Sequence, residues 1–272
     1  MKLIYFGNDP LASCVDVFLD CGWSIAAFYV SPLDRIEKDI QAKAEQLSVP
    51  VISEKPLLPC MEDHVKAGVN MFFSAEYLHK IPVPTKLQYA VNLHTSLLPL
   101  GRGVAPLPYI LERYPEASGL SLHKLSENFD QGDIILKREV GISTTDSMNT
   151  LAVKMYVEAP KILRRFLTAY EELYACAQPQ TDGETWPIPS ASARMLDWHL
   201  PAERLSRQIK AFGHFGTIMR MDNKYWRVVF AETIHAPHSA TPGDLLFQSD
   251  DLIAVSCLDG FVCIPRRALM PV

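Results

Sequence analysis

The sequence lacks the features that mark several common classes of protein. It has no run of about 18 apolar residues, so nothing in it predicts a membrane-spanning helix. Basic residues are not in excess, since 26 Lys and Arg stand against 31 Asp and Glu, and the net charge of −5 argues against a large nucleic-acid-binding surface. Low-complexity tracts are absent and 48% of the residues are hydrophobic, so we expect a globular chain throughout.

Signals for secretion and for metal binding are also missing. The N-terminal apolar run, residues 3–6, is too short for a signal peptide, so we expect a cytoplasmic protein. The six cysteines include no Cys-x-x-Cys pair, and no His/Cys cluster has the spacing of zinc ligands. We therefore expect reduced thiols, and we predict no metal.

Strand-like and helix-like segments alternate along the first half of the chain. Strands are predicted at residues 3–6, 24–30, 49–52, 69–74 and 89–94, and helices at residues 11–19, 36–47 and 61–66. This alternation favours an α/β fold with a Rossmann-like parallel sheet covered by helices on both faces. Further strands are predicted at residues 120–125 and 133–140, and a long helix at residues 147–174 with an interruption at Pro160. Only Gly7 is present where a dinucleotide site would have Gly-x-Gly-x-x-Gly, so NAD binding is not expected.

A segment rich in proline divides the chain. Residues 178–190 contain Pro179, Gly183, Pro187 and Pro189, which is typical of a linker. A helix pattern follows at residues 201–212, and then five β-like runs at residues 216–221, 224–230, 243–247, 252–256 and 261–265. Five short strands suggest a small OB-like β-barrel. We thus expect an N-terminal domain at residues 1–177, a linker at 178–190 and a small C-terminal OB-like domain at 191–272.

Asn92, His94 and Asp130 form the most informative pattern. Asn92 and His94 are two residues apart on a predicted strand and would project from the same face, and Asp130 comes 36 residues after His94. A His can move a proton near neutral pH, and an Asp beside it can fix its tautomer. An Asn amide can donate to the oxyanion of a tetrahedral intermediate. The strand ends where open α/β sheets bind ligands, so the pattern indicates a site for acyl transfer.

The motifs around these residues carry a family resemblance. They read Asn-x-His-x-Ser-Leu-Leu-Pro at residues 92–99, Arg-Gly-x-Ala-Pro at residues 102–106, and an Asp followed by Gly at residues 130–132. With them the chain resembles the folate-dependent formyltransferases, the family of methionyl-tRNA formyltransferase, strongly over residues 70–140 and more loosely elsewhere. The resemblance implies 10-formyltetrahydrofolate as the formyl donor and Asn92, His94 and Asp130 as the catalytic residues. It also implies the C-terminal OB-like domain.

The resemblance implies a role for each catalytic residue when an amine attacks the formyl carbon. Asn92 would donate to the oxyanion. His94 would move protons between the amine and the leaving folate nitrogen, or stabilise the intermediate as imidazolium, and Asp130 would orient His94 and stabilise its charge. Ser96 is expected to be a local hydrogen-bonding residue. We expect His123 to fill or edge the sheet.

The donor pocket of relatives is built from two loops. Their counterparts here are residues 73–82 and 126–129, and the resemblance implies Tyr77, Ile81, Glu127 and Asn128 as donor-binding residues.

The acceptor amine is less clearly indicated. Residues 31–47 have three basic and four acidic residues, and residues 191–272 have nine and eight, so the basic patches of the tRNA enzymes are not evident and tRNA is not the expected acceptor. Residues 73–77, 92–94 and 121–123 look closer to amino-sugar N-formyltransferases, such as the formyltransferase domain of the bifunctional lipid A aminoarabinose enzyme. A nucleotide-linked amino sugar is therefore the first expectation.

For such an acceptor Asn8, Asp9 and Arg102 are the candidate binding residues. Arg102 has an equal alternative as a charge that holds its own loop.

Other functions of the same residues stay open. The acceptor could be a hydroxyornithine-type siderophore precursor or methionyl-tRNA. Delivery of the formyl group to water would instead make the protein a formyltetrahydrofolate hydrolase. We expect a small-molecule partner, no membrane association and, in one alternative, a homodimer.

Overall fold

The computed structural model describes residues 1–31 and 38–272, and they form two compact units. The first unit contains residues 1–106, 116–141 and 153–186, and the second contains residues 107–115, 142–152 and 187–272. The helix predicted from Ile36 is described from Lys38 onwards as α2 (Lys38–Leu47), because Ile36 and Glu37 lie outside the described residues. The domain boundaries given above stay a prediction.

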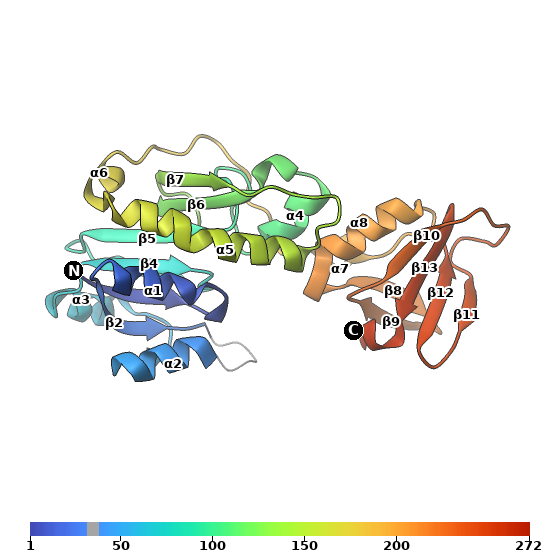
Figure 1. Cartoon of the computed structure of the whole chain (residues 1–272), viewed down its shortest axis with the longest axis horizontal. Coiled ribbons are helices and arrows are strands. Elements are labelled where there is room, and N and C mark those ends of the chain that lie inside the picture. Colours follow the sequence, from blue (N-terminus) through green and yellow to red (C-terminus); the bar gives the residue numbers. More distant parts are fainter. Residues whose placement is uncertain (32–37) are drawn as a thin grey trace. The chain divides into compact units, whose positions relative to one another are not determined.

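A seven-stranded sheet forms the centre of the first unit (Figure 1). Its strands are β1 (Lys2–Gly7), β2 (Ser24–Tyr29), β3 (Val51–Ile52), β4 (Met71–Ala75), β5 (Tyr89–His94), β6 (Gly119–Lys124) and β7 (Ile134–Glu139). They lie in the order β3-β2-β1-β4-β5-β6-β7. The pairs among β1 to β5 are parallel, whereas β5–β6 and β6–β7 are antiparallel. The Rossmann-like sheet is confirmed, with a mixed edge that the sequence pattern did not indicate.

The antiparallel pairing of β6 with β7 follows from the length of their connection. Residues 125–133 join β6 to β7, and a parallel connection needs a crossover of about a dozen residues or more, normally including a helix. The short connection therefore folds back as a hairpin and carries Asp130 at its tip.

Helices cover both faces of the sheet because the central strands are apolar on both sides. On β1 and β4, Phe6 and Phe72 pack with Met61 of α3 (Leu58–Lys66) on one face. On the opposite face Phe73 makes an edge contact with Phe18 of α1 (Ser13–Asp20), with ring centroids 5.0 Å apart. Strands buried on both faces read as continuous apolar runs, as β1 and β4 do.

The long predicted helix is divided at a different place from the one expected. α5 (Met148–Leu167) runs through Pro160 without a break and is followed by α6 (Tyr170–Ala175). Proline has no N–H to donate within the helix, but the fully buried side chains of Leu151, Met155 and Leu163 anchor α5 on both sides of it. Packing of this apolar stripe outweighs the local cost of the proline. The remaining helices are α4 (Pro106–Glu112), α7 (Ala191–Arg194) and α8 (Ala202–Phe212).

The second unit contains two antiparallel sheets. One has the strand order β10-β13-β12-β11 and the other β14-β9-β8. Their bounds are β8 (Thr217–Met221), β9 (Lys224–Val228), β10 (Glu232–His235), β11 (Leu245–Gln248), β12 (Leu252–Ser256), β13 (Gly260–Pro265) and β14 (Leu269–Pro271). Leu205 and Ile209 of α8 pack into a core with Val228, Ile253 and Val255. The five expected strands are present, and β10 and β14 are additional to them.

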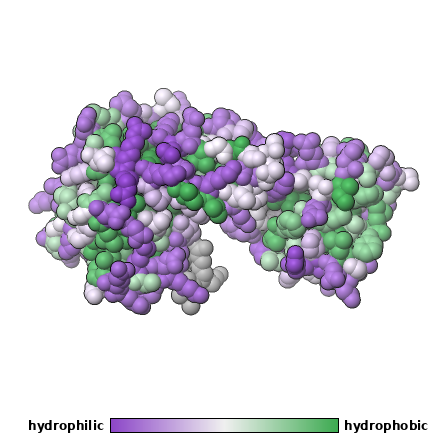
Figure 2. All heavy atoms as spheres, in the orientation of Figure 1, coloured by the Kyte–Doolittle hydropathy of each residue, from purple (hydrophilic) through white to green (hydrophobic). Residues whose placement is uncertain are grey.

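The surface of the second unit is partly apolar (Figure 2). The edge strand β11 exposes Leu245, Leu246 and Phe247 to 41%, 46% and 52%. In the described part of the chain, no helix combines the length and apolarity needed to cross a membrane.

The first half of the predicted linker is attached to the first unit. Gln178 and Ile134 exchange main-chain hydrogen bonds, Arg102 pairs with Thr185 as an isolated bridge, and Trp186 is 4% exposed. Residues 178–186 are thus a packed segment beside β7 and the loop after β5.

Candidate active site

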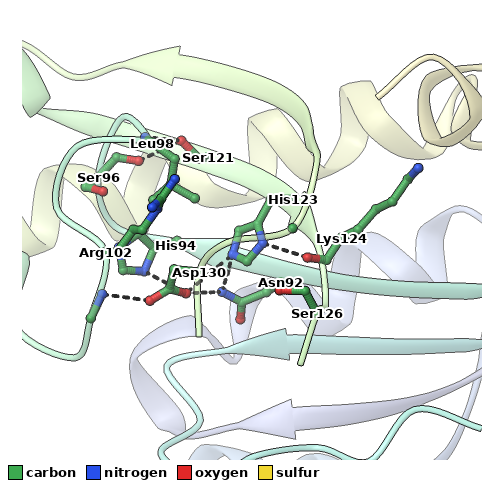
Figure 3. A network of polar contacts seen from close by, with 12 residues as sticks. Asn92, His94, Ser96, Leu98, Arg102, Ser121, His123, Lys124, Ser126 and Asp130 are labelled. Carbon is green, nitrogen blue, oxygen red and sulfur yellow. Dashed lines mark hydrogen bonds and ion pairs between the residues drawn. The ribbon is translucent and has the colours of Figure 1, made fainter. Parts of the chain in front are cut away.

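β5 brings Asn92 and His94 to the carboxyl end of the parallel strands. The alternation of a strand turns both side chains to one face, and the apolar neighbours Val91 and Leu93 are buried on the other. The β5–β6 register sets His123 directly opposite Asn92 and Ser121 opposite His94. Two adjacent strands thus present four polar side chains on one face of the sheet (Figure 3).

Asp130 reaches these side chains from the loop between β6 and β7. Its Oδ1 lies 3.6 Å from His94 Nδ1 and 3.4 Å from His123 Nε2, and its Oδ2 accepts a 2.8 Å hydrogen bond from the main-chain N–H of Gly103. The Asp130 φ of 57° is in the left-handed region, which non-glycine residues adopt less readily. The surrounding contacts therefore hold this carboxylate in place.

The hydrogen bonds of His94 fix its tautomer. Nε2 lies 2.7 Å from the carbonyl oxygen of Gly101, which can only accept, so Nε2 carries a proton. Nδ1 then faces Asp130 Oδ1 and is the nitrogen that can take up a proton. In the protonated ring both N–H groups would face an oxygen acceptor, so this arrangement suits an imidazolium.

Asp130 is held in its charged form. Burial alone would raise the pKa of this carboxyl, but the charge that His94 carries when protonated and the N–H of Gly103 act against burial, and the pKa lies well below its usual value. A fixed negative charge thus lies beside two imidazole rings.

His123 sets the orientation of the Asn92 amide. His123 Nδ1 donates to the Lys124 carbonyl at 2.8 Å, so the neutral ring presents a lone pair at Nε2. Asn92 Nδ2 donates to that nitrogen at 2.9 Å and to Asp130 Oδ1 at 3.4 Å. The amide oxygen points away from both partners (Figure 3). His123 is 1% exposed, so the ring cannot turn freely and the amide has one favoured orientation.

The loop after β5 contributes main-chain groups rather than a nucleophile. Ser96 Oγ donates to the carbonyl of Leu100 at 2.7 Å, and Ser121 Oγ donates to the carbonyl of Ser96 at 2.7 Å. Ser96 thus has a local hydrogen-bonding role. Gly103 has a φ of 106°, and a Cβ there would lie 2.7 Å from the carbonyl oxygen of Trp186, so this donor to Asp130 is restricted to glycine.

Comparison with known families identifies the fold and its chemistry. The family model described as "Formyl transferase" matches residues 39–167, and that described as "Formyl transferase, C-terminal domain" matches residues 190–269. The chain belongs to the formyltransferase family. It is therefore a transferase, and the resemblance read from its motifs is confirmed.

Individual relatives of this formyltransferase differ in their acceptors. The methionyl-tRNA formyltransferase of Geobacillus thermodenitrificans is 26% identical over 271 residues, which cover 94% of this chain and 85% of that protein. WlaRD, a sugar 3N-formyl transferase crystallised in the presence of dTDP and 5-N-formyl-THF, matches with a TM-score of 0.68 at 16% identity, over 97% of both chains. An N-formyltransferase of Helicobacter canadensis, in complex with folinic acid and dTDP-3-aminofucose, gives a TM-score of 0.66 at 16% identity, over 97% of this chain and 98% of that one. The two solved structures establish the fold of the formyltransferase, and its acceptor is left open.

The residues predicted to bind the donor lie on two loops of the formyltransferase. Tyr77 is 8% exposed, and burial raises the pKa of Tyr77 to about 12. Its buried hydroxyl has no hydrogen-bond partner among residues 1–31 and 38–272. Ile81 packs at the edge of the same apolar cluster. Glu127 and Asn128 are exposed on the loop that carries Asp130, where Asn128 Nδ2 donates to Gln131 Oε1 at 3.3 Å. Their role in donor binding stays a prediction.

The residues predicted to bind the acceptor already have partners within the chain. Asn8 is 3% exposed and its Oδ1 accepts from the N–H of Ser31, and Asp9 Oδ1 accepts from the N–H groups of Asp39 and Ile40 at the start of α2. Arg102 is 8% exposed and donates to oxygens of residues 180–183. These contacts favour the alternative in which Arg102 holds its own loop. Acceptor binding by the three residues stays a prediction.

Two polar residues of the site were not foreseen as participants. His123 was expected to fill or edge the sheet, and Gln180 lies in the predicted linker. The alternation Ser121-Leu122-His123 mirrors Asn92-Leu93-His94, and an antiparallel pairing of the two triplets would have brought His123 opposite Asn92. Gln180 follows no periodicity, so the sequence held no such signal for it.

Among the residues that the structure describes, no group of three or more His, Cys, Asp or Glu could hold a metal ion. The absence of a metal from the reaction stays a prediction.

Proposed function

We propose that this formyltransferase moves a formyl group from 10-formyltetrahydrofolate to the amine of a nucleotide-linked amino sugar. The observation that carries the proposal is the contact of Asn92, His94 and Asp130 on one face of the sheet. The acceptor class is supported by structural likeness to two sugar N-formyltransferases over nearly the whole of both chains, together with a net charge of −5.

The chain offers groups that fit a folate donor, which would supply an activated formyl carbonyl. In the predicted pocket loop, the Tyr77 hydroxyl has no hydrogen-bond partner among the residues that the structure describes, and Leu78 and Val83 of that region are exposed to 45% and 39%. A flat, partly apolar ring system with polar edges suits such a surface. Tyr77, Ile81, Glu127 and Asn128 would hold the donor.

The catalytic trio, Asn92, His94 and Asp130, then has a distinct task for each residue. Asn92 would donate the N–H that reaches Asp130 at only 3.4 Å, a weak bond that an oxyanion can replace. His94 would take the proton of the attacking amine at Nδ1 while Nε2–H stays on the Gly101 carbonyl. Asp130 would stabilise the imidazolium, and the proton would return to the leaving folate nitrogen as its bond to the formyl carbon breaks. The products are a formamide and tetrahydrofolate, so atoms and charge balance.

A second candidate is formylation of methionyl-tRNA. It is favoured by the Geobacillus relative, which aligns with 94% of this chain. A hydroxyornithine-type siderophore precursor and water are further acceptors that the same trio can serve, since none of its three side chains selects the nucleophile.

The test is release of tetrahydrofolate from 10-formyltetrahydrofolate with a panel of amines. The panel contains dTDP- and UDP-linked amino sugars, hydroxyornithine, charged initiator tRNA and a control without amine. Turnover with a nucleotide-linked amino sugar is expected. Turnover with the tRNA alone would establish the second candidate, and equal turnover in the control would make the protein a hydrolase.

A further inference from the structure

Gln180 makes a set of hydrogen bonds that is unusual for a residue between two domains. It lies in residues 168–189, between the parts of the chain that the two family models match. Its Nε2 donates to the main-chain carbonyls of Asp130 and Gly132 at 2.8 and 2.7 Å. Its Oε1 accepts from Arg102 Nε and Nη2 at 3.1 and 2.9 Å. Both N–H groups and both lone pairs are used, so the amide has one possible orientation.

Arg102 holds Gln180 from the other side. Nη2 and Nη1 donate to the carbonyls of Thr181 and Gly183 at 3.0 and 3.2 Å, and the main-chain N–H of Trp186 donates to the Arg102 carbonyl at 2.8 Å. The planar guanidinium therefore spans three oxygens of one segment, a geometry that a lysine could not reproduce.

The group that Gln180 holds is the main chain of Asp130. Asp130 has a φ of 57°, and Gly132, two residues further on, lies so close to β6 that a Cβ would be 1.9 Å from the Lys124 carbonyl oxygen. The two N–H groups of Gln180 donate to the carbonyls on either side of Gln131, and these bonds stabilise a backbone conformation that non-glycine residues adopt less readily. The direction of the Asp130 carboxylate depends on that conformation.

Arg102 and Gly103 thus hold both the side chain and the main chain of Asp130. Gly103 binds the carboxylate through its N–H, while Arg102 binds the main-chain carbonyl of Asp130 through Gln180. Because neighbours in sequence make the two contacts, a shift of the loop after β5 would move Asp130 with it.

We infer that Arg102 and Gln180 form a clasp that positions Asp130 against His94. Gln180 is a positioning residue, since it acts through Asp130 and has no contact with His94 or Asn92 among its hydrogen bonds. The inference rests on the proposed function, because it assigns the clasp to the same formyl transfer. It makes residues 180–186 part of the active site rather than a spacer.

The decisive variant is Gln180→Met, and Gln178→Met is its matched control. Gln178 is exposed on the same segment, and its side chain donates to the Cys176 carbonyl two residues away. We expect Q180M to lower kcat about 10- to 100-fold, because displacement of a catalytic group by about 1 Å can cost that much. The KM values for donor and acceptor should stay close to those of Q178M. The thermal midpoint should fall below that of Q178M, because methionine leaves the Asp130 and Gly132 carbonyls without their donor.

A second variant separates the two halves of the clasp. Gln180→Glu keeps oxygens for Arg102 but has no N–H for the carbonyls of Asp130 and Gly132. Its kcat should fall at least as far as that of Q180M. In an Asp130→Asn background Q180M should add little further loss, because both changes act on the same group. If Q180M does not fold, Q180N, whose amide is one methylene short of the carbonyls, takes its place.

Hydrogen exchange tests the clasp without turnover. Amides of residues 126–133 should exchange faster in Q180M than in Q178M. Wild-type kcat in Q180M, or an effect on acceptor KM alone, would overturn the inference. If no amine is a substrate for the wild type but exchange at residues 126–133 still accelerates, the clasp on Asp130 stands and the proposed function fails. Unchanged exchange would overturn the clasp whatever the activity.

Discussion

Replacement of His123 tests whether the orientation of the Asn92 amide matters to the reaction. His123→Met keeps most of the buried volume but removes the Nε2 acceptor at 2.9 Å and the Nδ1 donor to the Lys124 carbonyl. A neutral hydrogen bond contributes about 1 kcal/mol net, and a buried group left without its partner costs about 1–3 kcal/mol. The free energy of unfolding should therefore fall by about 2–4 kcal/mol.

The catalytic effect has a smaller and separable size. Without the His123 acceptor, the Asn92 amide is held by the 3.4 Å contact with Asp130 alone. Either its Nδ2 or its Oδ1 can then face the oxyanion, and only Nδ2 can donate to it. If the preference for the productive orientation of the amide falls by about 1.4 kcal/mol, kcat should fall about tenfold. His123→Gln places an amide oxygen within reach of Asn92 Nδ2 and should retain most of the activity.

A double-mutant cycle gives the refuting result. Asn92→Ala alone should lower kcat about 100- to 1000-fold, as loss of one oxyanion donor does. If His123 acts through Asn92, the H123M change should cost almost nothing further in the N92A background. Additive losses, measured as kcat at saturating donor and acceptor, would refute the proposed link between the two residues. Wild-type kcat in H123M would refute it as well.

Three further predictions concern other parts of the chain. Asp130→Asn should lower the free energy of unfolding by about 2 kcal/mol above pH 5, the contribution of a charged hydrogen bond. Since the folded-state pKa of Asp130 is lowered, the stabilisation by its carboxylate is present above the usual pKa near 4 and is lost as pH falls. Urea unfolding of the two proteins at pH 3 should therefore show a smaller difference, and a larger difference there would contradict the assignment. Ser96→Ala should keep kcat within about tenfold of wild type, because Ser96 Oγ donates to a carbonyl, whereas a loss like those of about a million-fold known for serine nucleophiles would indicate covalent catalysis. Pro160→Ala should raise the free energy of unfolding by about 1–2 kcal/mol. An interior proline costs a helix about 3 kcal/mol, and the greater freedom of the unfolded chain with alanine offsets part of that gain. A lower urea midpoint would show that Pro160 packs better than an alanine.

The parts of the fold that local pattern determines could be predicted from the sequence. β5 was expected at residues 89–94 and has those bounds, because polar Asn92 and His94 alternate with apolar residues. β10 and β14 were not expected, because they are short and largely exposed, and β14 ends at Pro271. Such strands depend on pairing with β13 and β9 rather than on their own composition.

The candidate site was predictable only where its residues share an element or a motif. Asn92 and His94 are on one strand, and Asp130 is in a recognisable motif. His123 required the register of β5 against β6, and Gln180 required the path of a segment without regular structure. Side-chain contacts to main-chain carbonyls leave no periodic trace, so no reading of residues 178–190 as sequence could have placed Gln180 beside Asp130.

Residues 101–103 form one short loop that contacts both His94 and Asp130. The Gly101 carbonyl takes the Nε2 proton of His94, the Gly103 N–H binds the Asp130 carboxylate, and Arg102 reaches the Asp130 main chain through Gln180. The two glycines have φ values of 72° and 106°, and a Cβ on either would lie 2.7 Å from an atom of Trp186. The loop therefore has one conformation compatible with both contacts. Since that conformation fixes the His94 tautomer and the Asp130 direction together, the main chain sets the geometry of the proposed proton acceptor before any substrate binds.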